Sequence, residues 1–134
     1  LAEGKFQTLL DDPRIEDKSK VKKLFFMSGK FYYDLDKVRD EKMAEDRAFI
    51  RLEQIYPLNK AKIEEIAASY PNAEEVYWAQ EEPNNMGASW YIQINFPLSI
   101  KKVISPSASA STAAGSSQLA AARQEAIINE VFNA

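Results

Sequence analysis

Residues 21–30, VKKLFFMSGK, decide the fold of this chain. Two lysines precede the apolar run Leu24–Met27, which is the pattern of a strand buried at the centre of a sheet. Ser28 follows at once and suits the N-cap of a helix. That helix is indicated by apolar residues at spacings of four and three, Phe31, Leu35 and Val38. A buried strand that leads directly into an amphipathic helix is typical of an α/β protein.

The same alternation of strand and helix continues along the chain. Strands are expected at Phe6–Leu10, Val21–Met27, Ala48–Glu53, Val76–Ala79 and Lys101–Ile104. Helices are expected from Ser28 to about Met43 and at Asn59–Tyr70, Met86–Gln93 and Leu119–Phe132. This order predicts a parallel or mostly parallel sheet with helices on both faces. The first strand has no crossover helix after it, so we expect it to pair antiparallel at an edge.

Two segments bear on the domain organisation. Residues 1–20 are a lead-in with the edge strand, and residues 21–134 are expected to form a single α/β domain. The Ser/Ala-rich run Ser105–Ser117 precedes the last helix and is expected to drape over the domain. The apolar stripe expected on that helix is Leu119, Ala122, Ala126, Ile127 and Val131. Since the first residue is Leu1 rather than Met, we expect the chain to be a piece of a longer protein.

The composition argues against several kinds of function. The chain has 134 residues and a net charge of −3, which offers no basic face for nucleic acid. No apolar run approaches the length of a membrane span, and no signal peptide is present. Cysteine and histidine are both absent, which excludes disulfides and cysteine nucleophiles and removes the commonest general base. The four glycines are too far apart for a phosphate-binding loop.

Polar residues follow four of the expected strands directly. They are Ser28-Gly29-Lys30, Glu53-Gln54, Gln80-Glu81-Glu82 and Ser105-Pro106-Ser107. Because the carboxyl ends of parallel strands meet at one rim of a sheet, these groups should come together there. The candidate contacts at this rim, for an interface or an anion, are Ser28, Lys30, Arg51, Glu53, Gln80, Glu81, Glu82 and Asn85.

Each candidate has a functional and a structural interpretation. Glu81 and Glu82 are either a general acid/base pair or a polar strand end, and adjacent residues of an extended segment point opposite ways. Ser28 and Lys30 either bind an anion at a helix N-terminus or simply begin the helix. Arg51, inside a strand, is expected to pair with an acid or to face a subunit contact.

Several stretches together resemble the C-terminal end of 2-oxoglutarate dehydrogenase, the decarboxylating component that depends on thiamine diphosphate. They are Ser28-Gly29-Lys30 with Tyr32-Tyr33-Asp34-Leu35, Arg51-Leu52-Glu53-Gln54-Ile55-Tyr56-Pro57-Leu58, and Gln80-Glu81-Glu82-Pro83 with Asn85-Met86-Gly87-Ala88. The resemblance covers nearly the whole chain in the right order. The chain departs from the family pattern where Ser89 stands between Ala88 and Trp90.

The resemblance implies a transketolase C-terminal-like domain, with three α/β/α layers around a five-stranded sheet whose first strand is antiparallel. It also implies a parent oxidoreductase of the tricarboxylic acid cycle, which decarboxylates 2-oxoglutarate and passes a succinyl group to the lipoyl arm of the succinyltransferase component. The parent is expected to be a homodimer in the bacterial cytoplasm or, in a eukaryote, the mitochondrial matrix. Its thiamine diphosphate and Mg²⁺ are expected to bind in preceding domains.

The sequence therefore predicts a structural and dimerisation domain that is not catalytic alone. No catalytic, cofactor-binding or metal-binding residue is assigned to it. One alternative is a regulatory module that binds an anion or nucleotide through Ser28, Lys30 and Arg51. The other alternative is the last domain of a different 2-oxoacid dehydrogenase or of a transketolase.

Overall fold

The computed structural model describes residues 8–42, 45–55, 57–82, 88–106 and 117–134, with the side chains of 117–120 excepted. Its strands are β1 (Leu9–Leu10), β2 (Lys23–Ser28), β3 (Arg47–Leu52), β4 (Glu75–Ala79) and β5 (Lys102–Ile104). Its α-helices are α1 (Gly29–Lys42), α2 (Lys60–Ala68), α3 (Ser89–Asn95) and α4 (Ser117–Asn133), and a short 3-10 helix spans Lys18–Lys20. The predicted alternation of strands and helices is confirmed.

The strands form one mixed sheet in the order β1-β3-β2-β4-β5. Strand β2 lies at the centre and pairs in parallel with β3 and β4, which places Phe25 beside Phe49 and Tyr77. Strand β1 pairs antiparallel with β3 through Leu9 and Leu52. The prediction of an α/β fold with a five-stranded, mostly parallel sheet and an antiparallel first strand is confirmed.

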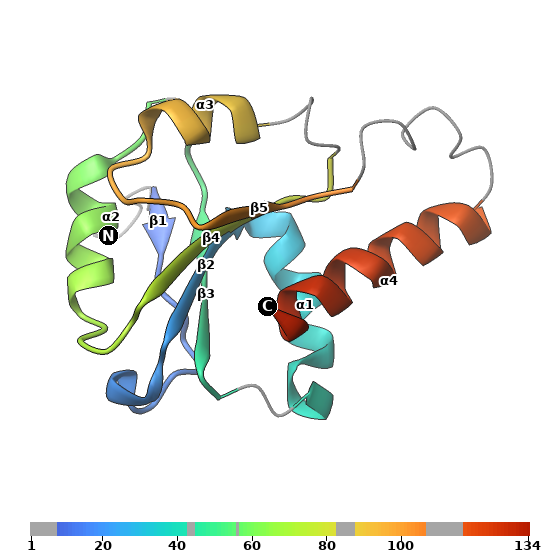
Figure 1. The fold of residues 1–134 in the computed structure, drawn as a ribbon, viewed down its shortest axis with the longest axis horizontal. Coiled ribbons are helices and arrows are strands. Elements are labelled where there is room, and N and C mark those ends of the chain that lie inside the picture. Colours follow the sequence, from blue (N-terminus) through green and yellow to red (C-terminus); the bar gives the residue numbers. More distant parts are fainter. Residues whose placement is uncertain (1–7, 43–44, 56, 83–87, 107–116) are drawn as a thin grey trace, which may run out of the picture.

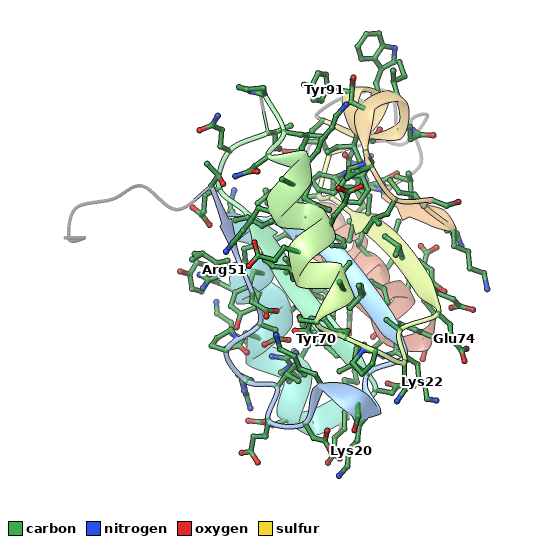
Figure 2. All side chains as sticks on the ribbon, turned by 90° about the vertical axis from the view of Figure 1, so that its left-hand side faces the viewer. Lys20, Lys22, Arg51, Tyr70, Glu74 and Tyr91 are labelled. Carbon is green, nitrogen blue, oxygen red and sulfur yellow. The ribbon has the colours of Figure 1, made fainter. Side chains whose placement is uncertain are left out.

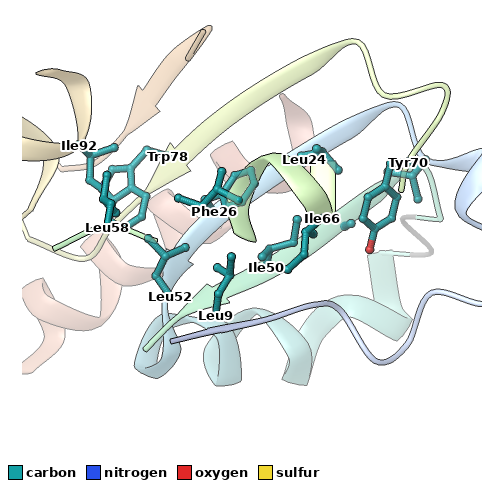
Figure 3. Close-up of a cluster of buried hydrophobic side chains, with 13 residues drawn as sticks. Leu9, Leu24, Phe26, Ile50, Leu52, Leu58, Ile66, Tyr70, Trp78 and Ile92 are labelled. Carbon is teal, nitrogen blue, oxygen red and sulfur yellow. The ribbon is translucent and has the colours of Figure 1, made fainter. Parts of the chain in front are cut away.

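Helices cover both faces of the sheet, with α2 and α3 on one side and α1 and α4 on the other (Figure 1). Side chains that alternate along β2 fill both layers, because successive residues of a strand point to opposite faces. Phe26 belongs to the layer under α2 and α3, where the Phe96 ring meets it edge-on at 5.0 Å. The labelled members of this layer in Figure 3 are Leu9, Leu24, Phe26, Ile50, Leu52, Leu58, Ile66, Tyr70, Trp78 and Ile92.

The layer under α1 and α4 is built on aromatic rings. Phe25 stacks on Tyr77 with ring centres 4.6 Å apart and meets Phe49 edge-on at 5.8 Å. Ile127 and Val131 of α4 close this layer. The expected stripe on the last helix is wrong in part, because Ala122 and Ala126 are exposed.

The lead-in is tied to both layers before β2 begins. Asp12 is buried and accepts hydrogen bonds from both terminal nitrogens of Arg39 in α1 and from the backbone N–H of Phe49. Asp11 accepts hydrogen bonds from Lys18 and from the hydroxyl of Tyr70, whose pKa is raised mainly by burial and also by that carboxylate. The lead-in is therefore packed as part of the same sheet structure.

Element boundaries differ slightly from the predicted ones. Asn59 caps α2 as expected, since its side chain accepts the N–H of Lys62, but the helix ends at Ala68 rather than at Tyr70. Tyr70 instead leaves the helix and is buried in the core. Helix α3 begins at Ser89, whereas Met86, where it was expected to begin, lies outside the described residues.

Candidate functional site

The carboxyl ends of the parallel strands form a common rim, as predicted. Ser28, the last residue of β2, is in register with Leu52, the last residue of β3, and Ala79 of β4 is in register with Met27. Figure 2 shows Tyr91 of α3 at the end of the molecule opposite Lys22 and Glu74, which lie before β2 and β4. Helix α3 therefore lies at the end of the sheet that carries the rim.

Glu53 follows β3 and lies against the start of α1. A Cβ atom built on Gly29, the first residue of α1, would collide with the Glu53 carboxylate. A carboxylate at the N-terminus of a helix interacts favourably with the helix dipole. The protein's own acid thus lies at the helix N-terminus where one of the two interpretations placed an anion bound by Ser28 and Lys30.

Arg51 is held by two tyrosines of α1. Its guanidinium carbon lies 4.5 Å from the ring centre of Tyr32 and 5.6 Å from that of Tyr33, and its Nη1 donates to the Tyr33 hydroxyl at 3.0 Å. The buried Nε atom has no hydrogen-bond partner in the described part of the chain. The expected acid partner is not found among the ion pairs of the described residues, and cation–π contact stabilises the guanidinium instead.

Gln80 supports the turn that follows β4. Its side chain is almost fully buried, accepts a hydrogen bond from Trp78 Nε1 at 2.8 Å and donates to the backbone carbonyl of Glu82 at 2.9 Å. Its backbone N–H donates to the carbonyl of Ile104 in β5. Gln80 therefore links β4, β5 and the core, which is a structural role.

Glu81 lies in an acidic cluster that joins α1 and α4 to the rim. The side-chain amide of Gln124 donates to Asp34 Oδ2 at 2.8 Å, and Gln124 also interacts with Glu81 and lowers its pKa. Burial raises the pKa of Glu81, and the nearby carboxylates of Asp34 and Glu82 raise it further, against the opposing effect of Lys30. The surroundings of Glu81 therefore disfavour the charged form of its carboxyl group.

The two adjacent glutamates lie in different environments. Glu81 is half-buried and interacts with Gln124, whereas the Glu82 side chain is exposed and its backbone carbonyl accepts a hydrogen bond from the Gln80 side chain. Lys30 is exposed and interacts electrostatically with Glu81. Asn85, the remaining candidate, lies outside the described residues.

Asp34 and Gln124 were not predicted as site residues. They are 90 positions apart and meet only because α1 and α4 pack on the same face of the sheet. The single available signal is that Asp34 lies one turn into the helix that follows the rim. The described residues contain no group of three or more acidic side chains that could hold a metal ion, nor a helix long and apolar enough to cross a membrane.

A comparison with known protein families shows to which family this chain belongs. The model of the family described as "2-oxoglutarate dehydrogenase C-terminal" matches residues 1–132. This chain belongs to that family. It is 37% identical over 97% of its length to a "2-oxoglutarate dehydrogenase E1/E2 component" of Corynebacterium glutamicum, of which the match covers 11%. A "2-oxoglutarate dehydrogenase E1 component" of Cupriavidus necator is 45% identical over 69% of this chain and 10% of the relative.

A third relative agrees with these two. It is a "Multifunctional 2-oxoglutarate metabolism enzyme" of Mycolicibacterium vanbaalenii, 37% identical over 97% of this chain and 11% of its own length. The resemblance inferred from the sequence is thereby confirmed. The chain spans about a tenth of the length of the curated relatives it matches.

Proposed function

We propose that this chain is the C-terminal structural and dimerisation domain of a 2-oxoglutarate dehydrogenase decarboxylating component, and that it is not catalytic alone. The family match over residues 1–132 carries this proposal. The parent would decarboxylate 2-oxoglutarate, transfer the succinyl group to the lipoyl arm of a dihydrolipoyl succinyltransferase, and act as a homodimer. Its bacterial relatives favour the cytoplasm as its location.

The contacts at the rim support a structural role. Glu53 lies against the start of α1, Gln80 is hydrogen-bonded within the core, and Glu81 is half-buried beside Gln124. Each of these side chains therefore serves the packing of the domain itself. Thiamine diphosphate and Mg²⁺ would supply the decarboxylation chemistry of the parent from its preceding domains. The described residues contain no group of three or more acidic side chains that could form a metal site of their own.

The isolated 134-residue chain provides the test. We expect it to unfold cooperatively on heating when followed by circular dichroism, because its sheet is buried on both faces. Calorimetry with thiamine diphosphate and Mg²⁺ should show no binding heat, and the chain should release no carbon dioxide from 2-oxoglutarate. Detection of either activity in the isolated chain would overturn the proposal.

The second candidate is a regulatory site for an anion or a nucleotide at Ser28, Lys30 and Arg51. The observation that favours it is the buried Nε of Arg51, which lacks a hydrogen-bond partner among the described residues, beside the exposed ring of Tyr33. Calorimetry with AMP and with acetyl-coenzyme A tests this site, with Arg51→Leu as the control that removes the cation. Absence of heat from both ligands ends the hypothesis.

The remaining alternative was a different 2-oxoacid dehydrogenase or a transketolase as the parent. The matched family and the names of the three relatives all refer to 2-oxoglutarate. We therefore keep 2-oxoglutarate as the proposed substrate of the parent.

A further inference from the structure

Helix α4 is attached to the sheet by few buried side chains. Among residues 121–133, all of whose side chains the structure describes, only Ile127 and Val131 are buried. Helix α1, which covers the same face and is shorter, has four buried residues (Figure 1). Since the packing of an apolar face supplies most of the stability of a helix in a protein, α4 is held less firmly than α1.

The carboxyl end of α4 is capped by side chains of the sheet. Arg47, at the start of β3, donates to the backbone carbonyl of Val131 at 2.6 Å and to that of Ala134 at 3.2 Å. Lys23, at the start of β2, also donates to the carbonyl of Ala134. The last turn of α4 has no basic residue of its own, although cations stabilise this end of a helix. The helix therefore obtains this cap only while it is docked on the sheet.

Arg47 is held in place by the sheet and not by the helix. It is buried, its guanidinium carbon lies 5.6 Å from the ring centre of Phe25, and its Nε donates to Asp46 at 3.0 Å. Neither contact involves α4, so both can persist when the helix leaves. Arg47 is therefore positioned to bind the end of the helix again.

Two further polar contacts of α4 lie at the surface. Glu130 pairs with Lys102 at 2.6 Å, although the Lys102 side chain is 59% exposed. Lys42 of α1 donates to Asn129 at 3.3 Å, also in an exposed position. Exposed polar pairs contribute little to stability, because water competes for both partners. The buried hydrogen bond from Arg47 is therefore a stronger attachment of α4 than either of these.

We infer that α4 is a detachable strap: it opens as a unit while the five-stranded sheet stays folded, and Arg47 holds it closed. The inference is independent of the proposed function, because it rests only on contacts within this chain. Opening breaks no strand pairing, since α4 follows the last strand. It also leaves intact the apolar layer under α2 and α3, which lies on the other face of the sheet.

Opening would uncover the aromatic layer of the sheet. The rings of Phe25, Phe49 and Tyr77 belong to this layer, and Phe132 of α4 meets Phe49 edge-on at 5.5 Å. Exposure of such rings to water is unfavourable, so the open form is a minor state of the protein. Local openings of this kind cost less free energy than complete unfolding, and exchange of backbone amide hydrogens detects them.

Hydrogen exchange of the folded 134-residue chain, measured amide by amide by NMR, tests whether α4 opens alone. We expect the amides of residues 121–133 to exchange at least about tenfold faster than the slowest amides of β2, after correction for their intrinsic rates. Equal protection of the two elements would show that α4 is lost only with the whole fold, and the inference would be wrong.

Ile66→Val distinguishes opening of α4 from complete unfolding. Ile66 is buried in the layer under α2, on the face away from α4. Loss of its methyl group should speed exchange of the β2 amides about fivefold, because complete unfolding becomes easier. Exchange of the α4 amides should stay unchanged, since the open form keeps the contacts of Ile66. Equal acceleration of both elements would overturn the inference.

Arg47→Leu tests the contact that holds the strap closed. It should speed exchange of the α4 amides about tenfold or more, because the charge-assisted bonds to the end of the helix are lost. Arg51→Leu is the matched control at the other end of β3, where the arginine contacts Tyr32, and should leave these rates unchanged. Arg47→Lys, which keeps the charge but not the forked donors, provides the same comparison if Arg47→Leu does not fold. Equal α4 exchange in the Arg47 variant and the control would contradict the role of Arg47.

Discussion

The two ends of the parallel sheet differ in how their charges are satisfied. Strand β3 carries one arginine near each end, and β4 has one glutamate at its start and another just after its end. At the amino end, Arg47 donates to the carbonyl of Val131 at 2.6 Å and to Asp46 at 3.0 Å. At the carboxyl end, Arg51 is stacked on tyrosines with its Nε unpaired within the described residues.

The glutamates repeat this contrast. Glu75 accepts hydrogen bonds from Lys101 and from the Tyr77 hydroxyl, which lower its pKa to about 2. Glu81 has its pKa raised by burial among other acids. Among the described residues, Arg47 and Glu75 at the amino end are paired with opposite charges, whereas at the carboxyl end Arg51 Nε has no hydrogen-bond partner and the charged form of Glu81 is disfavoured.

The largest expected effect is a difference in the free energy of unfolding between Arg47→Leu and Arg51→Leu. Arg47 is buried, and its loss removes charge-assisted bonds to α4, so unfolding should become easier by about 3 kcal/mol. Arg51→Leu should cost about 1 kcal/mol or less, because the lost cation–π contacts are offset by removal of an unsatisfied atom. Urea denaturation of both variants measures the difference.

A second readout makes the Arg47 prediction specific. The hydrogen bond from Arg47 is the main reason that the pKa of Asp46 is lowered. In Arg47→Leu, the pKa of Asp46 followed by NMR should therefore rise toward the ordinary value for aspartate. Equal stability losses in the two arginine variants would remove the distinction between the two ends of the sheet.

Gly29→Ala tests the contact of Glu53 with the start of α1. A Cβ atom at this position meets the end of the flexible Glu53 side chain, so the carboxylate must move away. We expect a loss of about 0.5–1 kcal/mol, since the favourable interaction with the helix dipole is lost. In the background Glu53→Ala, the same change should stabilise the protein by up to about 1 kcal/mol, because alanine is a better helix former than glycine. The same sign in both backgrounds would contradict the contact.

The main features of the fold were predictable from the sequence for physical reasons. Buried parallel strands are short apolar runs, and helices that cover them show spacings of three and four, so Leu24–Met27 and its following helix were recognisable. The antiparallel edge strand followed from the missing crossover. Ala122 and Ala126 were wrongly predicted to lie on the buried side of α4. The side that faces α1 includes the polar Gln124, which sequence periodicity assigns to the solvent side.

The position of the candidate site was predictable from the sequence, but the side chains that contact its residues were not. The rim follows from strand order, but the pairing of Glu81 with Gln124 depends on how α4 packs. Asp12 was not singled out, since nothing in its sequence context indicates that Arg39 would reach it from α1. Long-range polar contacts of this kind are set by tertiary packing, which local spacing does not contain.

A smaller effect is expected at Glu75, at the amino end. Its lowered pKa means that the folded protein binds this proton more weakly than the unfolded chain, so the carboxylate stabilises the fold above the ordinary pKa of glutamate. That stability is lost as the pH falls toward about 2. Glu75→Gln should therefore be less stable than the parent chain at pH 7 and equally stable in strong acid, as measured by thermal unfolding across pH. A pH-independent difference would contradict the ion pair.

Glu81→Gln, at the carboxyl end, should give the smallest effect and the opposite sign. Because the folded-state pKa of Glu81 is raised, its stabilising contribution is present in acid and is lost as the pH rises through that value. The variant should match the parent chain below about pH 4, near the pKa of unfolded glutamate, and exceed it by a few tenths of a kcal/mol at pH 7. Glu82→Gln, the same change at the exposed neighbouring position, is the matched control. If Glu81→Gln destabilises the chain at pH 7, the carboxylate is favoured in its charged form, and the two ends of the sheet are electrostatically alike.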